Sequence, residues 1–306
     1  MSEERKKTFP FIYEMLIMLV PCAATACFLN GLTTLRLILT CVGVCVLTDG
    51  AGTLLLKREL TLKDMSAVVT GLCLAMMLPA SCPAGTAALV SLFSVAAGKL
   101  PFGDYEKSPF VPAAAGIAFL TVLHPDRLFD YTVSSSSVTN ASLTAMLQNG
   151  NSVNVTAPGL LGILAGNRPG PAGCTCVFLF LACLVYLAIR NFPKFMTATG
   201  FVAVCALFSL IFPRVFSGGT ASLIMELGGG MLLFAAVFLL PYPNVTISSV
   251  PLSLAYGAAG GILCMLIRYF GTNEEGVCFA VLIINALSPL FTGSKRLPMR
   301  GGDADA

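Results

Sequence analysis

One carboxylate in this sequence stands inside an apolar stretch. Glu226 lies in the run LIMELGGG, with apolar residues before it and three glycines after it. Because a carboxylate at membrane depth is costly, such a residue is a candidate for ion or proton transfer by default. Asp49, near the end of another apolar stretch, is interpreted in the same way. The alternative is that each carboxylate lies at a membrane boundary, where its charge carries no special meaning.

Other reactive residue types point away from soluble-type catalysis. A single histidine, His124, cannot supply the acid–base pairs that most hydrolases need. The twelve cysteines fall mainly inside apolar stretches without CxxC spacing, which is typical of small buried side chains. Cys41 with Cys45, and Cys174 with Cys176, leave a cluster ligand set open. No metal site is otherwise indicated.

Composition indicates the solvent in which these residues must be placed. Hydrophobic residues make up 56% of the 306 residues, charged residues make up 11%, and the mean hydropathy is +0.86. The net charge of +3 is small and scattered, so no nucleic-acid partner is expected. These values predict an all-α polytopic protein whose main partner is the lipid bilayer.

About ten transmembrane helices are expected, because a bilayer core needs about 20 apolar residues per crossing. The third and fourth stretches are too short for a straight crossing. The predicted stretches are 11–29, 35–56, 66–79, 85–98, 112–123, 174–189, 195–212, 221–240, 252–267 and 277–290.

Basic residues beside the stretches predict the orientation. Lys and Arg cluster before the first stretch and after the second, and again after the sixth and tenth, which places both termini in the cytoplasm. The first stretch has no obvious cleavage site, so no secretory signal is expected. The predicted parts are a cytoplasmic tail (1–10), a first transmembrane repeat (11–123), an extracytoplasmic loop (124–173), a second repeat (174–291) and a cytoplasmic tail (292–306).

The two halves share a sequence pattern. Residues 69–83, VTGLCLAMMLPASCP, and residues 228–243, GGGMLLFAAVFLLPYP, both have a glycine start, an apolar run and a Leu-Pro ending. The two copies lie in the third and eighth stretches, five positions apart in the order of spans, and an odd offset places them in opposite orientations. The pattern therefore predicts two inverted five-helix repeats with short or broken helices.

Several motifs together resemble a known family. The segments DMSAVVTGLCLAMMLP, GKLPFGDYEKSPFVPAA, LAGNRPGPAG and EEGVCFAVLIINALSPLF are similar to segments of the D subunit of Rnf-type ion-translocating electron-transport complexes, in the RnfD/NqrB family. The resemblance covers nearly the whole chain. It implies a bacterial inner-membrane subunit that works with other complex subunits and couples electron transfer through flavin to Na⁺ or H⁺ transport.

The resemblance also implies flavin-binding residues. Family members carry FMN, attached by a flavin transferase to a hydroxyl in an SGAT-like motif, and riboflavin is a further possible cofactor. The corresponding residues here are Thr139, Asn140, Ala141 and Ser142, with Ser142 as the candidate acceptor. Asn140 replaces the motif's glycine, which puts attachment in question. Gly71 and Lys99, in two of the matching segments, are further cofactor-binding candidates.

Two rival interpretations stay open. Inverted repeats with paired short helices describe secondary transporters and channels for small solutes equally well. A family member without flavin, serving as a scaffold for the other subunits, is the second alternative, because the attachment motif departs from the family pattern.

Overall fold

The computed structural model is built from helices, and the described residues contain no β-strand. Five helices are long: α1 (Glu3–Asn30), α2 (Leu32–Leu55), α4 (Ala84–Gly98), α10 (Phe192–Ile211) and α13 (Val250–Phe270). Four are shorter but apolar: α3 (Ser66–Met77), α5 (Pro112–Leu123), α9 (Val177–Arg190) and α14 (Val277–Ala286). The described residues are 3–57, 65–103, 108–131, 142–148, 160–166, 168–214, 219–243, 245, 247–273 and 275–292.

Five helices in the described part are long and apolar enough to cross a membrane. A sixth candidate is α11 (Gly219–Gly228) together with α12 (Leu232–Phe234) and the π-helical turn η4 (Ala235–Leu239), which are bent by 64° at a short break and form either one broken span or a re-entrant loop. With the four shorter helices, all ten predicted apolar stretches contain a helix. The protein is therefore an all-α polytopic membrane protein.

Three boundaries differ from the sequence prediction. The fourth stretch is not too short, because the 3₁₀ turn η2 (Leu100–Phe102) extends α4 to a 19-residue span. The helix α1 begins at Glu3 and so includes most of the segment predicted as a tail. The helix α9 begins only at Val177, because the preceding residues bond to α3 instead: Gly173 N–H donates to Met76 O at 2.9 Å.

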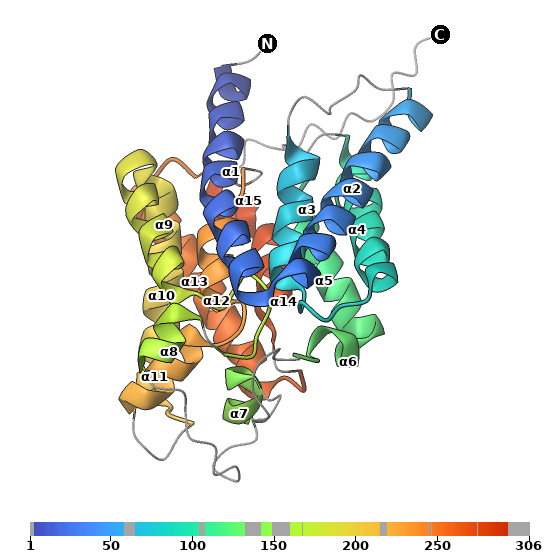
Figure 1. Cartoon of the computed structure of the whole chain (residues 1–306). Helices are drawn as coiled ribbons and strands as arrows, with labels where there is room; N and C mark the ends of the chain where they lie inside the picture. Colours follow the sequence, from blue (N-terminus) through green and yellow to red (C-terminus); the bar gives the residue numbers. More distant parts are fainter. Residues whose placement is uncertain are drawn as a thin grey trace.

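Short helices mark the polar segment between the halves. These are α6 (Pro125–Leu128), α7 (Leu143–Gln148) and α8 (Leu160–Ala165), and α15 (Ser288–Thr292) follows the last apolar helix. In Figure 1, α1 begins at the top, whereas α6, α7 and α11 lie toward the bottom. Two of the short helices of the predicted outer loop, α6 and α7, thus lie toward the end of the molecule opposite the start of α1.

The second and fourth helices of each half lie side by side and run parallel. In the first half, Cys45 on α2 bonds to Ser91 O on α4, and Gly52 packs further along against Leu100. In the second half α10 pairs with α13 in the same way, and Cys205 approaches Gly261 O. Because α2 ends at the top of Figure 1 and α10 ends toward α11 at the bottom, the halves are inverted.

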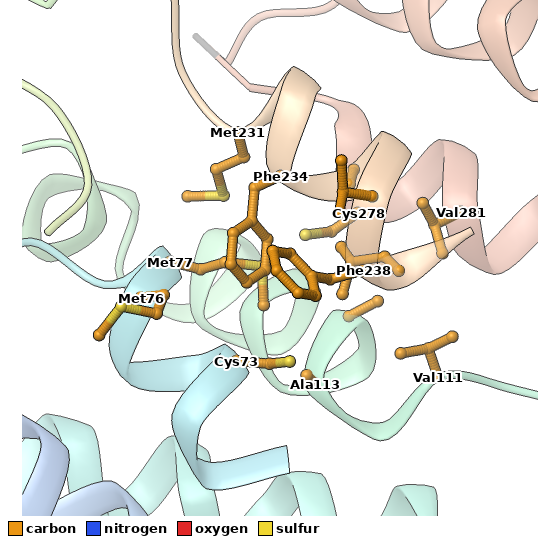
Figure 2. Packing of buried hydrophobic residues seen from close by; sticks show 14 of the residues in the cluster. Cys73, Met76, Met77, Val111, Ala113, Met231, Phe234, Phe238, Cys278 and Val281 are labelled. Carbon is orange, nitrogen blue, oxygen red and sulfur yellow. The ribbon is translucent and has the colours of Figure 1, made fainter. Parts of the chain in front are cut away.

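The inverted halves meet at their broken or shortened helices. Figure 2 shows Met77 of α3 beside Phe234 and Phe238 of the α12–η4 segment. The starts of α5 and α14 complete this buried cluster, in which every labelled side chain is hydrophobic. Since lipid offers no hydrophobic driving force, such close packing is what holds membrane helices together.

Candidate functional site: buried ion pairs at helix ends

The most unusual feature of the second half is a guanidinium inside the break between α11 and α12. Arg268, in the last turn of α13, is 1% exposed. It donates from Nη1 to Glu226 O at 3.1 Å and from Nη2 to Gly229 O at 3.2 Å. The last carbonyls of a helix have no partner within the helix and carry partial negative charge. Arg268 therefore stabilises the end of α11.

Glu275 places a negative charge at the start of α12. Its Oε1 accepts from Met231 N–H at 3.3 Å and lies 3.2 Å from Arg268 Nη2. A carboxylate is favourable at the positive end of a helix. The Arg268–Glu275 ion pair thus places a cation at the end of α11 and an anion at the start of α12. These charges stabilise the two helix ends, which have no water to bond to inside the protein.

The glycines at the break make room for these contacts. Gly230 has φ +59°, and the Glu275 carboxylate occupies the space that a side chain at this position would fill. Gly228 and Gly229 lie against Ile163 of α8 and Thr144 of α7. The Gly228–Gly230 run therefore allows close packing and leaves room for the Glu275 carboxylate.

Glu226 is fully buried and faces two arginines. Its Oε2 lies 3.0 Å from Arg268 Nη1 and its Oε1 lies 3.7 Å from Arg214 Nη1. Neither oxygen has a hydrogen-bond partner of good geometry in the described part of the chain. Glu226 is thus held by charge attraction, with acceptor capacity left over.

Arg214 connects this cluster to the surface. Its Nη2 donates to Arg268 O at 2.6 Å, and its guanidinium lies over the Tyr269 ring at 3.6 Å. Partial burial lowers the pKa of Arg214 from its ordinary value, which the nearby Glu226 opposes. Beside it is a cavity of about 480 Å³, whose lining includes Gln148 of α7. The cavity is also lined by Arg214 and Arg268, the two arginines that face Glu226.

A second buried ion pair lies in the first half. Lys99, directly after α4, places Nζ 2.8 Å from Asp49 Oδ2 of α2 and 2.7 Å from Ser66 Oγ at the start of α3. The side chains of Lys99 and Asp49 are 2% and 0% exposed. Each half therefore has a buried cation at the end of its fourth helix, Lys99 after α4 and Arg268 in α13.

The structure places the predicted site residues in separate groups. It joins Asp49 and Lys99, which the sequence suggested for different roles, and it places Glu226 in the other half. Gly71 lies against α2, where an added Cβ would be 2.6 Å from Val42 Cα, so it serves helix packing.

Ser142, the candidate acceptor, lies at the start of α7. Its Oγ accepts from Ala145 N–H at 3.0 Å, shares a 2.8 Å hydrogen bond with Thr144 Oγ1, and is enclosed, with Ser142 only 2% exposed. The hydroxyl thus acts as an N-cap. Thr139 and Asn140 lie outside the described residues.

The twelve cysteines are free thiols, and no group of three metal-ligating side chains occurs in the described ranges. Of the pairs left open by the sequence, Cys41 faces the α4 side of α2, and Cys174 bonds to Met76 O. These contacts fit small buried side chains rather than a ligand set.

Sequence reasoning missed Arg268, Glu275, Arg214 and Ser66. A signal was present for Arg268, because an arginine within the apolar run GILCMLIRYF is as costly in a membrane as a carboxylate. The motif around Glu275 was noticed only for its similarity to the family.

Comparisons with known proteins agree over almost the entire chain. Residues 2–296 match the model of the NQR2, RnfD, RnfE family. The D subunit of the Na⁺-translocating ferredoxin:NAD⁺ oxidoreductase complex of Acetobacterium woodii is 28% identical over 291 residues, covering 94% of this chain and 88% of the relative. The D subunit of the proton-translocating ferredoxin:NAD⁺ oxidoreductase complex of Clostridium ljungdahlii is 25% identical, with 91% and 87% covered. Its counterpart in the ion-translocating oxidoreductase complex of Escherichia coli K12 is 26% identical, with 94% and 93% covered.

Proposed function

Because the chain belongs to the NQR2, RnfD, RnfE family, we propose that it is the D-type membrane subunit of an ion-translocating oxidoreductase complex in a bacterial cytoplasmic membrane. The observation that carries the proposal is the family match over residues 2–296. The buried ion pairs support it, since ionisable groups at membrane depth mark ion and proton pathways. The positive residues beside the apolar stretches favour a cytoplasmic position for both termini.

Assembly tests this proposal directly. The chain carrying an affinity tag, purified in mild detergent from its native membranes, should bring with it the other subunits of one complex and a ferredoxin:NAD⁺ oxidoreductase activity. Copurified subunits are identified by mass spectrometry. A chain that purifies alone, from membranes whose oxidoreductase activity survives its deletion, contradicts the proposal.

The ion pairs define what coupling would require. Glu226 and Asp49 each have a cation within ion-pair distance. A Na⁺ or H⁺ that reached either carboxylate would therefore compete with Arg268 or Lys99. An intact ion pair has no net charge to attract a cation. Ion transport is therefore coupled to electron transfer when a change of redox state alters the distance between the carboxylate and its cationic partner in each pair.

A flavin is the cofactor that this function needs. The chain offers an acceptor oxygen at Ser142 and two guanidiniums, Arg214 and Arg268, lining the cavity that also borders α7. These residues fit a phosphate-bearing group, with the requirement that the first turn of α7 opens, because Ser142 Oγ is enclosed and capping. A bound flavin, whether FMN on Ser142 or riboflavin held without a covalent bond, would supply electron transfer. The residues would supply orientation and a positive environment.

Fluorescence of the denatured protein tests covalent attachment. The chain is expressed with a flavin transferase and separated on a denaturing gel, beside Ser142→Ala and a control, Thr144→Val, which keeps the candidate oxygen. A fluorescent band in the wild type and in Thr144→Val, lost in Ser142→Ala, supports FMN on Ser142. Bands of equal intensity in all three place the flavin elsewhere.

A subunit without covalent flavin is the second candidate. The observation that favours it is the N-cap made by Ser142 Oγ to Ala145 N–H. Absence of fluorescence in all three proteins, with the complex still assembled and no flavin released from it on denaturation, supports a scaffold function.

A further inference from the structure

A cavity of about 360 Å³ lies where three membrane helices begin. Its lining includes Phe11, Asn191, Lys194, Leu240, Ser248 and Tyr256. Three of the apolar spans start beside it, at Phe11, Phe192 and Val250. The cavity therefore lies at a boundary of the apolar layer, between α1 of the first half and α10 and α13 of the second.

Lys194 gives the cavity its charge. Its Nζ donates to Pro241 O at 2.7 Å and lies 3.2 Å from the centre of the Phe11 ring. No carboxylate in the described part of the chain forms an ion pair with it. Glu14, whose charge acts on Lys194, is already 2.9 Å from Arg190. An ammonium has three N–H donors, so Lys194 can bind an anion without giving up Pro241.

The corresponding place in the first half is filled by the chain itself. There the peptide that precedes α9 packs against the Leu78–Pro79 turn after α3. Ala172 N–H donates to Leu78 O at 2.9 Å, and Asn30, just before α2, contacts Ala172 O at 3.4 Å. In the second half the equivalent turn is Leu240–Pro241, and the asparagine before α10 is Asn191. No described segment fills the space between them, which is the cavity.

We propose that this cavity binds the phosphate of an anionic phospholipid such as phosphatidylglycerol. The Lys194 ammonium, which forms no ion pair with a carboxylate among the described residues, attracts the phosphate. Basic pockets between helices on the cytoplasmic side of a membrane are typical lipid headgroup sites. The apolar wall, with Phe11 and Leu240, suits the glycerol and the first acyl carbons. A lipid here links α1 to the second half, as residues 171–174 link the second half to α3. The proposal is independent of flavin.

Lipid titration of the purified full-length protein tests this site. Delipidated protein is titrated with phosphatidylglycerol or phosphatidylcholine, and bound lipid is counted by native mass spectrometry while thermal unfolding is followed. Phosphatidylglycerol should give a bound lipid and a raised unfolding temperature, and phosphatidylcholine should give neither. Lys194→Gln should lose both effects. The control Lys57→Gln, which removes an exposed lysine at the end of α2, should keep both.

Two further arms keep the test decisive. Ser248→Trp fills the exposed rim of the cavity without touching the core, and should lose the bound lipid even if Lys194→Gln fails to fold. Inorganic phosphate is added alone to the delipidated protein. An equal effect of phosphate alone would overturn the lipid assignment in favour of a soluble phosphate compound. Equal phosphatidylglycerol binding by the wild type and both cavity variants would overturn the site.

Discussion

Arg268 Nη2 and Glu275 Oε1 lie 3.2 Å apart inside the break between α11 and α12, each aligned with the helix end whose partial charge it opposes. Breaking a buried pair by removing one partner costs about 3–5 kcal/mol. We therefore expect Arg268→Met to unfold at a clearly lower temperature in detergent, because it leaves Glu275 buried without this cation and leaves Glu226 with the more distant Arg214. Arg268→Lys should be intermediate, since an ammonium is a point charge and lacks the planar fork.

The matched control for Arg268 is Arg190→Met. It removes an arginine that also pairs with a glutamate, Glu14, but at the exposed surface. The thermal unfolding of this variant should match that of the wild type. If Arg268→Met also unfolds at the wild-type temperature, the ion pair does not hold the break.

The pair in the first half should behave as a unit. Asp49→Asn removes the carboxylate from the buried Lys99 ammonium, and is expected to destabilise the protein by about 3–5 kcal/mol. The double variant Asp49→Asn/Lys99→Met removes both charges of this pair and should recover most of that loss. Unfolding in detergent compares the single and double variants. Additive losses in the double variant would show that the two residues do not stabilise each other.

Gly230 is the backbone position on which the break depends. Gly230→Ala places a Cβ where the Glu275 carboxylate lies and strains a residue at φ +59°. A loss of about 1–3 kcal/mol is expected from the backbone strain alone. Gly43→Ala, in the interior of α2 with open space around it, should be neutral or stabilising by about 0.5–1 kcal/mol. Equal stability of the two alanine variants would argue against the carboxylate position.

The sequence predicts the helices well because each apolar stretch must satisfy its own backbone in lipid. All ten stretches contain a helix, and the glycine start shared by residues 69–83 and 228–243 remains the sequence prediction of a repeat. The 64° bend could not be predicted from hydropathy, since residues 221–240 form one apolar run. The Gly228–Gly230 run was the available signal for it.

The sequence could not predict which charged residues form ion pairs with each other. Asp49 and Lys99 are 50 residues apart, and Glu226 and Arg268 are 42 apart, so only the packed helices bring them together. Each residue was visible alone as a charge beside or inside an apolar run. In the first half, the pairing of cation and carboxylate depends on the parallel contact of α2 and α4, and in the second half it depends on the packing of α11 against the end of α13. No local pattern encodes either contact.

The most direct test of redox-coupled ion transport is ion uptake by inverted membrane vesicles from cells that lack the native chain and carry Glu226→Gln. The control Glu14→Gln removes a carboxylate outside the break. Electron transfer from reduced ferredoxin to NAD⁺ and uptake of Na⁺ or H⁺ are measured in the same vesicles. We predict that the wild type and Glu14→Gln take up ions, and that Glu226→Gln assembles but its uptake per electron falls to the level of uncoupled vesicles. Wild-type uptake per electron in Glu226→Gln would contradict the assignment of the buried carboxylate to the ion pathway.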